Sequence, residues 1–364
     1  MGRARKPIRP VLLAAAAAVV LLTASSFGSG SGHPTGRKPP RPSSPFYVGV
    51  GLSDGVVRSD GRRYDVPLIG GISISAVRGV FSPDHAKAVV PSPTVVPPRT
   101  SWRHLRIVDL SNGSSRAVST EPLTAPPVFG PHGDIAYASG TTVHFLDGRT
   151  IRARGLPNGA KIIILELSPK DGVAAALVTW NWQGKYPDPS EALYVISPRQ
   201  TRRVVGGLEA LSEQPDPVWS PNGDRIAFSR VVRGRGTVVY VVRSDGSDLR
   251  EISQGRRASG PIWSPNGKQL AYTQNNGHDE VYISDLNGHE RRLTRTQVKP
   301  GWIDMVDDPF PGTVAGAWSP DGRYVAVITA NRLGVVDAAS GEERLLGVEV
   351  GPTDGPVGWP PASR

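Results

Sequence analysis

The sequence predicts an all-β protein, a β-propeller of about seven four-stranded blades. Two observations lead to this fold class: a Trp-Ser-Pro-Asn/Asp-Gly motif recurs along the chain, and its copies keep the spacing of one blade. The first residue of the motif lies at positions 81, 129, 167, 219, 263, 318 and 359. Successive copies are therefore 48, 38, 52, 44, 55 and 41 residues apart. One sheet cannot bury both of its faces, so units repeated at this period are typical of blades stacked around a ring.

The motif itself indicates a strand that ends in an aromatic residue, then a tight turn and a second strand. The clearest copies are Val218–Arg230, Ile262–Tyr272 and Ala317–Val327, and weaker copies follow Phe81, Phe129 and Leu167. Pro presets φ at the second turn position, Asp or Asn bonds its own backbone, and Gly accepts positive φ. We therefore interpret the Ser-Pro sequences as turns rather than as catalytic serines.

The repeated tryptophans Trp219, Trp263 and Trp318 are expected to be wedges between blades. Each buries roughly 150 to 250 Å², which stabilises the fold by about 4 to 6 kcal/mol at 25 cal/mol per Å². Three equivalent copies indicate packing rather than ligand contact.

The remaining strands follow in chain order within each unit. In the fourth unit we expect strands at Arg225–Arg230, Val238–Arg243 and Leu249–Ser253. Elsewhere the middle or outer strands are predicted at Leu105–Asp109, Val173–Thr179, Ala192–Ser197, Leu333–Asp337 and Arg344–Gly347. His85 stands where the first turn would have Gly.

The two ends of the propeller predict how the ring closes. Phe46–Leu68 is predicted to form three strands of a blade that lacks its first strand. Pro356–Trp359 is predicted to form a first strand that no further strand follows. Together they would complete a seventh blade, which removes an exposed sheet edge. A six-bladed ring is the alternative.

Residues 1–26 have the layout of a secretory signal peptide. Four basic residues up to Arg9 precede an uncharged run, Val11–Thr23, and then small residues. This run is shorter than the roughly 20 residues that span a bilayer, which favours cleavage over an uncleaved anchor. Residues 27–45, rich in Gly, Ser and Pro, are predicted to be a disordered linker, and residues 46–364 the propeller domain.

Composition excludes several kinds of function. The chain has no cysteine, so disulfides, thiolate metal sites and thiol nucleophiles are absent. Of its net charge of +10, seven positive charges lie in residues 1–45, which leaves +3 for the remainder. That is too little for a domain that tracks nucleic-acid phosphates. We expect a monomer that binds no nucleic acid.

The repeats resemble those of TolB-like, Trp-Asp-related propellers. The likeness rests on Trp-Ser-Pro-Asn/Asp-Gly followed by Ile-Ala-Phe or Leu-Ala-Tyr, and on Glu280–Gly288 ending in Arg291–Thr294. It is specific in units four to six, looser in units one to three, and extends from Phe46 to Trp359. The resemblance implies an extracytoplasmic interaction propeller. TolB itself has six blades and an amino-terminal α/β domain that is not found here, so its partners are not carried over.

Local catalytic motifs are not found. The sequence contains no Gly-x-Ser-x-Gly elbow, no P-loop and no His-Glu-x-x-His helix, and its seven histidines lack ligand spacing. We therefore expect no catalytic residues, no cofactor, no metal and no enzymatic activity. The alternative is a hydrolase or lyase propeller that uses the carboxylates Asp304, Asp307 and Asp308, with or without a divalent ion.

Two long insertions, Trp180–Asp188 and Arg295–Thr313, are the candidate ligand-binding segments. Because loops between second and third strands share one face with loops between blades, both would open on the same side, which we name the insertion face; Pro91–Trp102 would join them there. Mixed aromatic and acidic loops on a rigid scaffold suit binding. The candidate residues are Trp180, Trp182, Tyr186, Trp302, Asp304, Asp307 and Asp308.

The function predicted from these observations is a secreted or otherwise extracytoplasmic binding scaffold. Its partner would be a protein, peptide or glycan of the cell envelope or the extracellular space. A membrane-tethered sensor, held by an uncleaved signal, is a further alternative. The opposite side of the ring, which we name the turn face, consists of Ser-Pro-Asp-Gly and Asp-Gly turns whose side chains serve backbone geometry, and it is expected to leave little room for a site.

Overall fold

A computed structural model describes residues 47–50, 55–65, 81–84, 86–96, 99–180, 191–207, 217–255, 257–277, 279–295, 313–329, 332–349 and 357–358. All of them belong to one compact unit, Lys38–Arg364; the other unit is Met1–Arg37. Within the described ranges no helix has the length and apolar character needed to cross a membrane.

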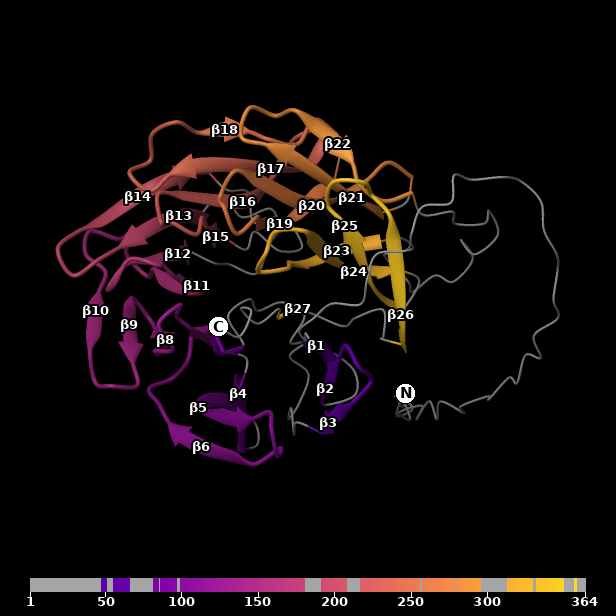
Figure 1. The fold of residues 1–364 in the computed structure, drawn as a ribbon. Helices are drawn as coiled ribbons and strands as arrows, with labels where there is room; N and C mark the ends of the chain where they lie inside the picture. The colour runs from indigo at the N-terminus through magenta and orange to yellow at the C-terminus, as the bar shows by residue number, and fades with distance from the viewer. Residues whose placement is uncertain are drawn as a thin grey trace, which may run out of the picture. The chain divides into compact units, whose positions relative to one another are not determined.

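The described strands form seven antiparallel sheets, six with four strands and one with three (Figure 1). Blade 1 contains β4 (Lys87–Val96), β5 (Arg99–Asp109) and β6 (Ser115–Ser119). Blade 2 contains β7 (Ala125–Phe129), β8 (Ile135–Ser139), β9 (Thr142–Phe145) and β10 (Thr150–Arg152). Blade 3 contains β11 (Lys161–Leu167), β12 (Ala174–Thr179), β13 (Glu191–Ile196) and β14 (Thr201–Gly206).

The second half of the chain repeats this order. Blade 4 contains β15 (Val218–Trp219), β16 (Arg225–Val232), β17 (Gly236–Arg243) and β18 (Arg250–Glu251). Blade 5 contains β19 (Ala258–Trp263), β20 (Gln269–Asn275), β21 (Asp279–Asp285) and β22 (Glu290–Arg292). Blade 6 contains β23 (Thr313–Trp318), β24 (Tyr324–Thr329), β25 (Arg332–Asp337) and β26 (Glu343–Glu349). The predicted all-β propeller is confirmed.

Blade 7 joins the two ends of the propeller as the sequence predicted. It contains β27 (Val357–Gly358), β1 (Tyr47–Val50), β2 (Gly55–Arg58) and β3 (Arg63–Asp65), in that order across the sheet. Tyr47 pairs with Gly358 and Val48 with Val357 in an antiparallel ladder. Figure 1 shows β27 beside β1, so the last strand of the chain completes the first sheet.

Blade 1 differs from the other sheets. Its first strand is reduced, within the described residues, to a single bridge between Phe81 and Ala88. Pro91–Trp102, predicted to be a loop insertion, instead lies largely in a long hairpin, because β4 and β5 pair from Lys87 with Asp109 to Val96 with Arg99.

The Ser-Pro motifs form buried turns. Ser264 Oγ accepts a hydrogen bond from the Gln269 amide at 2.9 Å and donates to Asn266 Oδ1 at 2.8 Å. The same pair of bonds recurs at Ser82, Ser220 and Ser319. These serines are 2 to 5% exposed. Because each hydroxyl is used twice inside its own turn, the Ser-Pro motif is structural.

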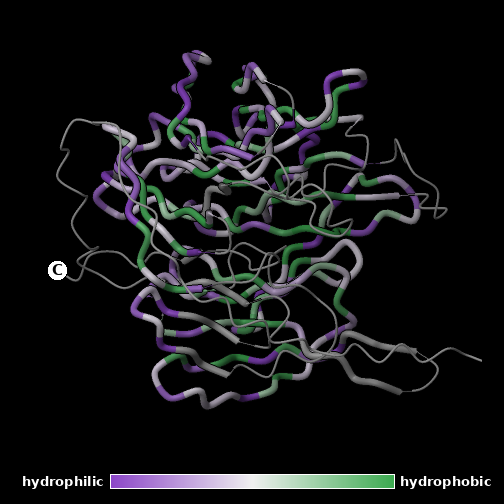
Figure 2. The backbone as a smooth tube through the Cα atoms, turned by 90° about the vertical axis from the view of Figure 1, so that its right-hand side faces the viewer, coloured by the Kyte–Doolittle hydropathy of each residue, from purple (hydrophilic) through white to green (hydrophobic). Residues whose placement is uncertain are grey.

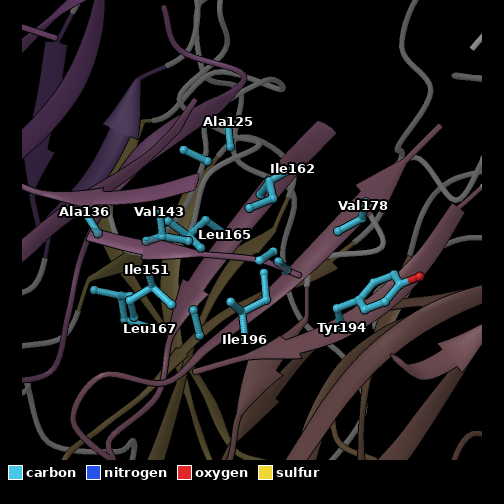
Figure 3. Packing of buried hydrophobic residues seen from close by; sticks show 14 of the residues in the cluster. Ala125, Ala136, Val143, Ile151, Ile162, Leu165, Leu167, Val178, Tyr194 and Ile196 are labelled. Carbon is cyan, nitrogen blue, oxygen red and sulfur yellow. The ribbon is translucent and has the colours of Figure 1, made fainter. Parts of the chain in front are cut away.

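The apolar core lies between successive sheets. In one cluster, residues of blade 2 such as Val143 and Ile151 meet residues of blade 3 such as Ile162 and Ile196 (Figure 3). Figure 2 shows the hydrophobic stretches running along the strands while hydrophilic residues gather at the turns and ends. This arrangement leaves the loops and turns of the two faces as the surfaces available for recognition.

Candidate functional site

On the turn face, the turns of neighbouring blades interlock through their glycines. A Cβ added at Gly267 would lie 3.5 Å from Pro221 Cδ of blade 4, and one at Gly322 would lie 3.7 Å from Pro265 Cδ of blade 5. At Gly223 the nearest atom, Ser168 Oγ of blade 3, is 3.0 Å away. Each of these glycines has φ between +66° and +71°, which only glycine adopts freely. The turns of blades 3 to 6 therefore form a closed row.

Within the described residues, the corresponding contact is missing between the turns of blades 1 and 2. The corresponding glycine of blade 2, Gly133, would meet nothing within 4 Å if it carried a Cβ. A cleft of about 890 Å³ lies here, within the size range of ligand sites. Its lining comes from both turns of each blade: Ser82, Pro83, Asp84, Lys87, Ile107, Asp109, Ser114, Ser115, Arg116, Phe129, Pro131, His132, Gly133, Asp134, Ile135, Phe145, Leu146 and Asp147. We name it the blade-1/2 cleft.

Departures from the repeat explain part of this opening. Gly130 takes the position of the turn serine, so blade 2 lacks the hydroxyl that organises the other turns. The carboxylate of Asp134 fills the vacated space, since a Cβ at position 130 would overlap Asp134 Oδ1. His132 replaces the turn Asp or Asn and its ring contacts the carbonyl of Pro169 in blade 3 at 3.1 Å. The blade 2 turn is thus bonded to blade 3.

The floor of the cleft is apolar. Ile107, Phe129 and Ile135 are 7 to 9% exposed and belong to the core cluster shared by blades 1 and 2, against which Leu146 packs. Phe145 is 5% exposed. The rings of Phe129 and Phe145 therefore form part of the cleft floor, and only their edges are accessible from the cleft.

Ionised carboxylates form part of the rim. The Ser82 hydroxyl and the Ala86 amide donate to Asp84, and these bonds lower the pKa of that carboxyl. The hydroxyl and amide of Ser111 do the same for Asp109 and lower its pKa. Hydrogen bonds from donors stabilise the charged form. Both groups are therefore anionic at neutral pH.

The cations of the rim are fewer. Four carboxylates, Asp84, Asp109, Asp134 and Asp147, face two cations, Lys87 and Arg116, which gives the lining a net charge of −2 with His132 neutral. Arg149 also neutralises Asp147, since it donates through its amide at 2.9 Å and through Nε at 2.6 Å. The cleft is a net acidic site in a protein whose net charge is +10.

Most of the predicted ligand-binding residues lie outside the described residues. This applies to Trp182, Tyr186, Trp302, Asp304, Asp307 and Asp308. Trp180 is described: it is half-buried and packs against the core cluster of blades 2 and 3. Its role in ligand binding stays a prediction.

The cleft residues were missed by the sequence reasoning, which expected little room on the turn face. That expectation holds where the turns interlock, in blades 3 to 6, and fails between blades 1 and 2. The available signal was the weakness of the motif there: Gly130 for Ser and His132 for Asp or Asn both break the pattern.

Among the described residues, no group of three or more His, Cys, Asp or Glu side chains could hold a metal ion. The acidic segment with Asp304, Asp307 and Asp308 is outside these ranges.

Comparison with known proteins confirms the propeller fold. Residues 231–340 match the family model described as the dipeptidyl peptidase IV (DPP IV) N-terminal region. No curated protein matches the sequence. The structure is similar to TolB from Acinetobacter baumannii, with 18% identity, a TM-score of 0.45, and coverage of 86% of this chain and 81% of that chain.

Two further solved structures come from enzymes. Oligogalacturonate lyase from Vibrio parahaemolyticus shares 11% identity over 84% of each chain, with a TM-score of 0.53. Dipeptidyl peptidase 4 from Porphyromonas gingivalis shares 15% identity, covers 84% of this chain and 52% of that chain, and has a TM-score of 0.50.

These likenesses contradict the prediction that the chain is not an enzyme. The matched family model comes from a peptidase, and the same fold occurs in a lyase. The prediction rested on the lack of local motifs such as the Gly-x-Ser-x-Gly elbow. That inference was unsound because a propeller brings residues from distant blades together, so a site on this fold requires no continuous motif.

Proposed function

We propose that this TolB-like propeller is an exported recognition module that binds a protein, peptide or glycan in the blade-1/2 cleft. The observation that carries the proposal is the interruption of the interlocked turn row at the place where the 890 Å³ cleft lies. An apolar floor with a few charged groups at the rim is the usual composition of a binding site.

The scaffold supports this role because it holds the two walls of the cleft independently of a ligand. Blades 1 and 2 share a buried core beneath the cleft, with Val89 and Leu105 from one blade and Tyr137 from the other. A preformed site loses little conformational entropy on binding, which favours affinity.

The direct test is to fill the cleft. Ser114 is exposed and lines it, so Ser114→Trp should block a ligand and leave the fold intact. The matched control is Ser247→Trp, at the same turn position of blade 4: the Ser247 carbonyl accepts from the Arg243 amide as the Ser114 carbonyl accepts from the Asp109 amide. Partners captured from the cell envelope by the wild-type protein should be lost with Ser114→Trp and retained with Ser247→Trp. Retention with both variants would contradict the proposal.

An enzymatic function is the second candidate, favoured by the match of residues 231–340 to the dipeptidyl peptidase IV N-terminal region and by the lyase likeness. Its groups would be the carboxylates Asp304, Asp307 and Asp308, acting with or without a divalent ion. The assay is turnover of oligogalacturonate with and without Mn²⁺, and of dipeptidyl amides. Activity that disappears in Asp307→Asn would support this candidate.

The insertion-face residues are a second proposed binding surface. Trp182 and Trp302 would supply apolar area, and truncation of such residues typically costs roughly 2 kcal/mol of binding free energy. Trp182→Ala combined with Asp307→Ala should then weaken binding of a captured partner at least about tenfold. If this double variant binds normally while Ser114→Trp does not, recognition belongs to the cleft.

Export is proposed from residues 1–26, with a linker over 27–45 and the propeller over 46–364. Mass spectrometry of the exported protein tests cleavage of the signal. Membrane-bound protein that begins at Met1 or Gly2 would support the membrane-tethered alternative.

A further inference from the structure

We infer that the blade-1/2 cleft selects an extended peptide segment with basic side chains, held through the carboxylates of Asp84 and Asp109. This inference rests on the proposed function of the cleft and specifies its ligand. The hydrogen bonds and ion pairs of the charged groups on the rim support it.

Asp84 and Asp109 each keep one carboxylate oxygen that the strongest turn donors leave open. The donors Ser82, Ala86 and Ser111 all bond Oδ1, and the Asn112 amide is a weaker donor to Asp109. Asp134 differs, because its Oδ1 occupies the vacated serine position of its own turn and its Oδ2 lies 3.6 Å from Arg149 Nη2. A carboxylate oxygen left open by its turn accepts a charge-assisted hydrogen bond from Lys or Arg.

Three turn-face carboxylates of other blades are paired with cations of the protein itself, whereas Asp245 and Asp321 accept only turn donors among the described residues. Asp224 receives Lys170 Nζ at 2.5 Å across the boundary of blades 3 and 4. Asp248 receives Arg225 at 2.9 Å as well as Arg250. Asp337 lies 3.4 Å from Arg323. The rim of the cleft differs from these blades because it gathers Asp84 and Asp109 at one opening, in a lining with more carboxylates than cations.

The shape and the mixture of charges favour a peptide over a glycan. Phe129 and Phe145 are almost completely buried, so no exposed ring face is available on which a sugar could stack. Lys87 and Arg116 add hydrogen-bond donors to the lining, which suit peptide carbonyls. Apolar side chains of a peptide would rest on Leu146, which is only partly buried, while its basic side chains reach the rim.

The chain itself supplies variants that remove charge and keep the turn. Asn222 and Asn266 occupy in blades 4 and 5 the position that Asp84 occupies in blade 1, and they accept the serine hydroxyl in the same way. Asp84→Asn should therefore fold normally. The matched control is Asp321→Asn, the same charge removal at the equivalent turn of blade 6, away from the cleft.

The experiment measures binding of capped peptides to the full exported chain by fluorescence anisotropy. The probes are peptides of Ala, Val and Gln, about ten residues long, that carry two Arg residues, two Glu residues or neither. We expect the Arg peptide to bind best and to weaken with added salt. Asp84→Asn combined with Asp109→Asn should weaken it about five- to tenfold, since each exposed charge pair contributes modestly. Asp321→Asn should leave its affinity unchanged.

The outcomes distinguish failure of the specificity for basic peptides from failure of the cleft as the binding site. Equal binding of all three peptides that is lost with Ser114→Trp would overturn the basic specificity while leaving the cleft as the binding site. Equal weakening by Asp321→Asn and by the double variant would overturn the inference, because it would reveal attraction to the general surface. If no peptide binds and Ser114→Trp retains all captured partners, the proposed function fails as well.

Discussion

The indole Nε1 of Trp263 donates a hydrogen bond of 2.9 Å to the backbone carbonyl of Val218, the residue that precedes the equivalent tryptophan of the preceding blade. The relationship repeats around the ring: Trp219 donates to Glu166 at 3.2 Å, and Trp318 donates to Ile262 at 3.3 Å. These tryptophans are 5 to 8% exposed. Each is both an apolar wedge and a hydrogen-bonded link between blades, as the repetition of the motif indicated. Blades 2 and 3 have Phe129 and Leu167 at this position, so they lack the indole donor.

Trp263→Phe should separate the two contributions of the wedge. The phenyl ring keeps much of the apolar burial, but the carbonyl of Val218 loses its donor in a partly buried position. We expect a loss of about 1 to 2 kcal/mol in the free energy of unfolding, against about 3 to 5 kcal/mol for Trp263→Ala. Urea denaturation followed by fluorescence of the remaining tryptophans measures both. An equal loss for the two variants would show that the hydrogen bond dominates.

Gly223→Ala and Gly133→Ala test the interlocking of the turn face. Both glycines have positive φ, +67° and +84°, so both variants carry a backbone penalty of about 1 kcal/mol. Only Gly223 has close neighbours, Ser168 Oγ at 3.0 Å and Lys170 Cγ at 3.2 Å. Thermal unfolding should therefore show a lower melting temperature for Gly223→Ala. Equal melting temperatures would mean that the turns of blades 3 and 4 are not in tight contact.

The pair of Asp285 and His289 predicts a pH dependence at the acidic end. The His289 ring lies 2.9 Å from Asp285 and lowers the pKa of that carboxyl to about 2. A carboxyl with a lowered folded-state pKa contributes stability that is fully present above its unfolded value of 3.8 and is lost as the pH falls toward about 2. Asp285→Asn should flatten this part of the stability profile, measured by denaturation between about pH 5 and pH 2. The effect should be small, because the His289 side chain is 82% exposed, the Asp285 side chain is 35% exposed, and solvent screens the pair.

Removal of residues 355–364 tests the closure of the ring. The truncation deletes β27 and leaves the β1 edge of blade 7 without the partner that Tyr47 and Val48 have in the intact chain. Exposed edges promote association between molecules. The truncated protein should melt at a lower temperature and elute partly as larger species in size-exclusion chromatography. Unchanged melting and elution would show that closure contributes little.

The sequence by itself determined the class and the modular plan of this protein. The turn residues at Ser264 and Asn266 act within a few positions of each other, so their local chemistry is readable without a fold. The period of the tryptophans likewise predicted the number of sheets. The complementary ends, Phe46–Leu68 and Pro356–Trp359, predicted the pairing of β1 with β27. All of these are properties of one repeat or of the comparison between repeats.

Only the tertiary structure decided where the ring of turns leaves space. The blade-1/2 cleft brings Asp84 and Asp109 of one repeat to the same opening as Asp134 of the next, and this depends on how two sheets pack, not on the motif of either. Only the structure shows likewise that the ring of Trp180 packs against the core of blades 2 and 3, and its part in ligand binding stays a prediction. Repetition specifies the contacts inside a blade, whereas a site between blades arises from long-range packing where the repetition is broken.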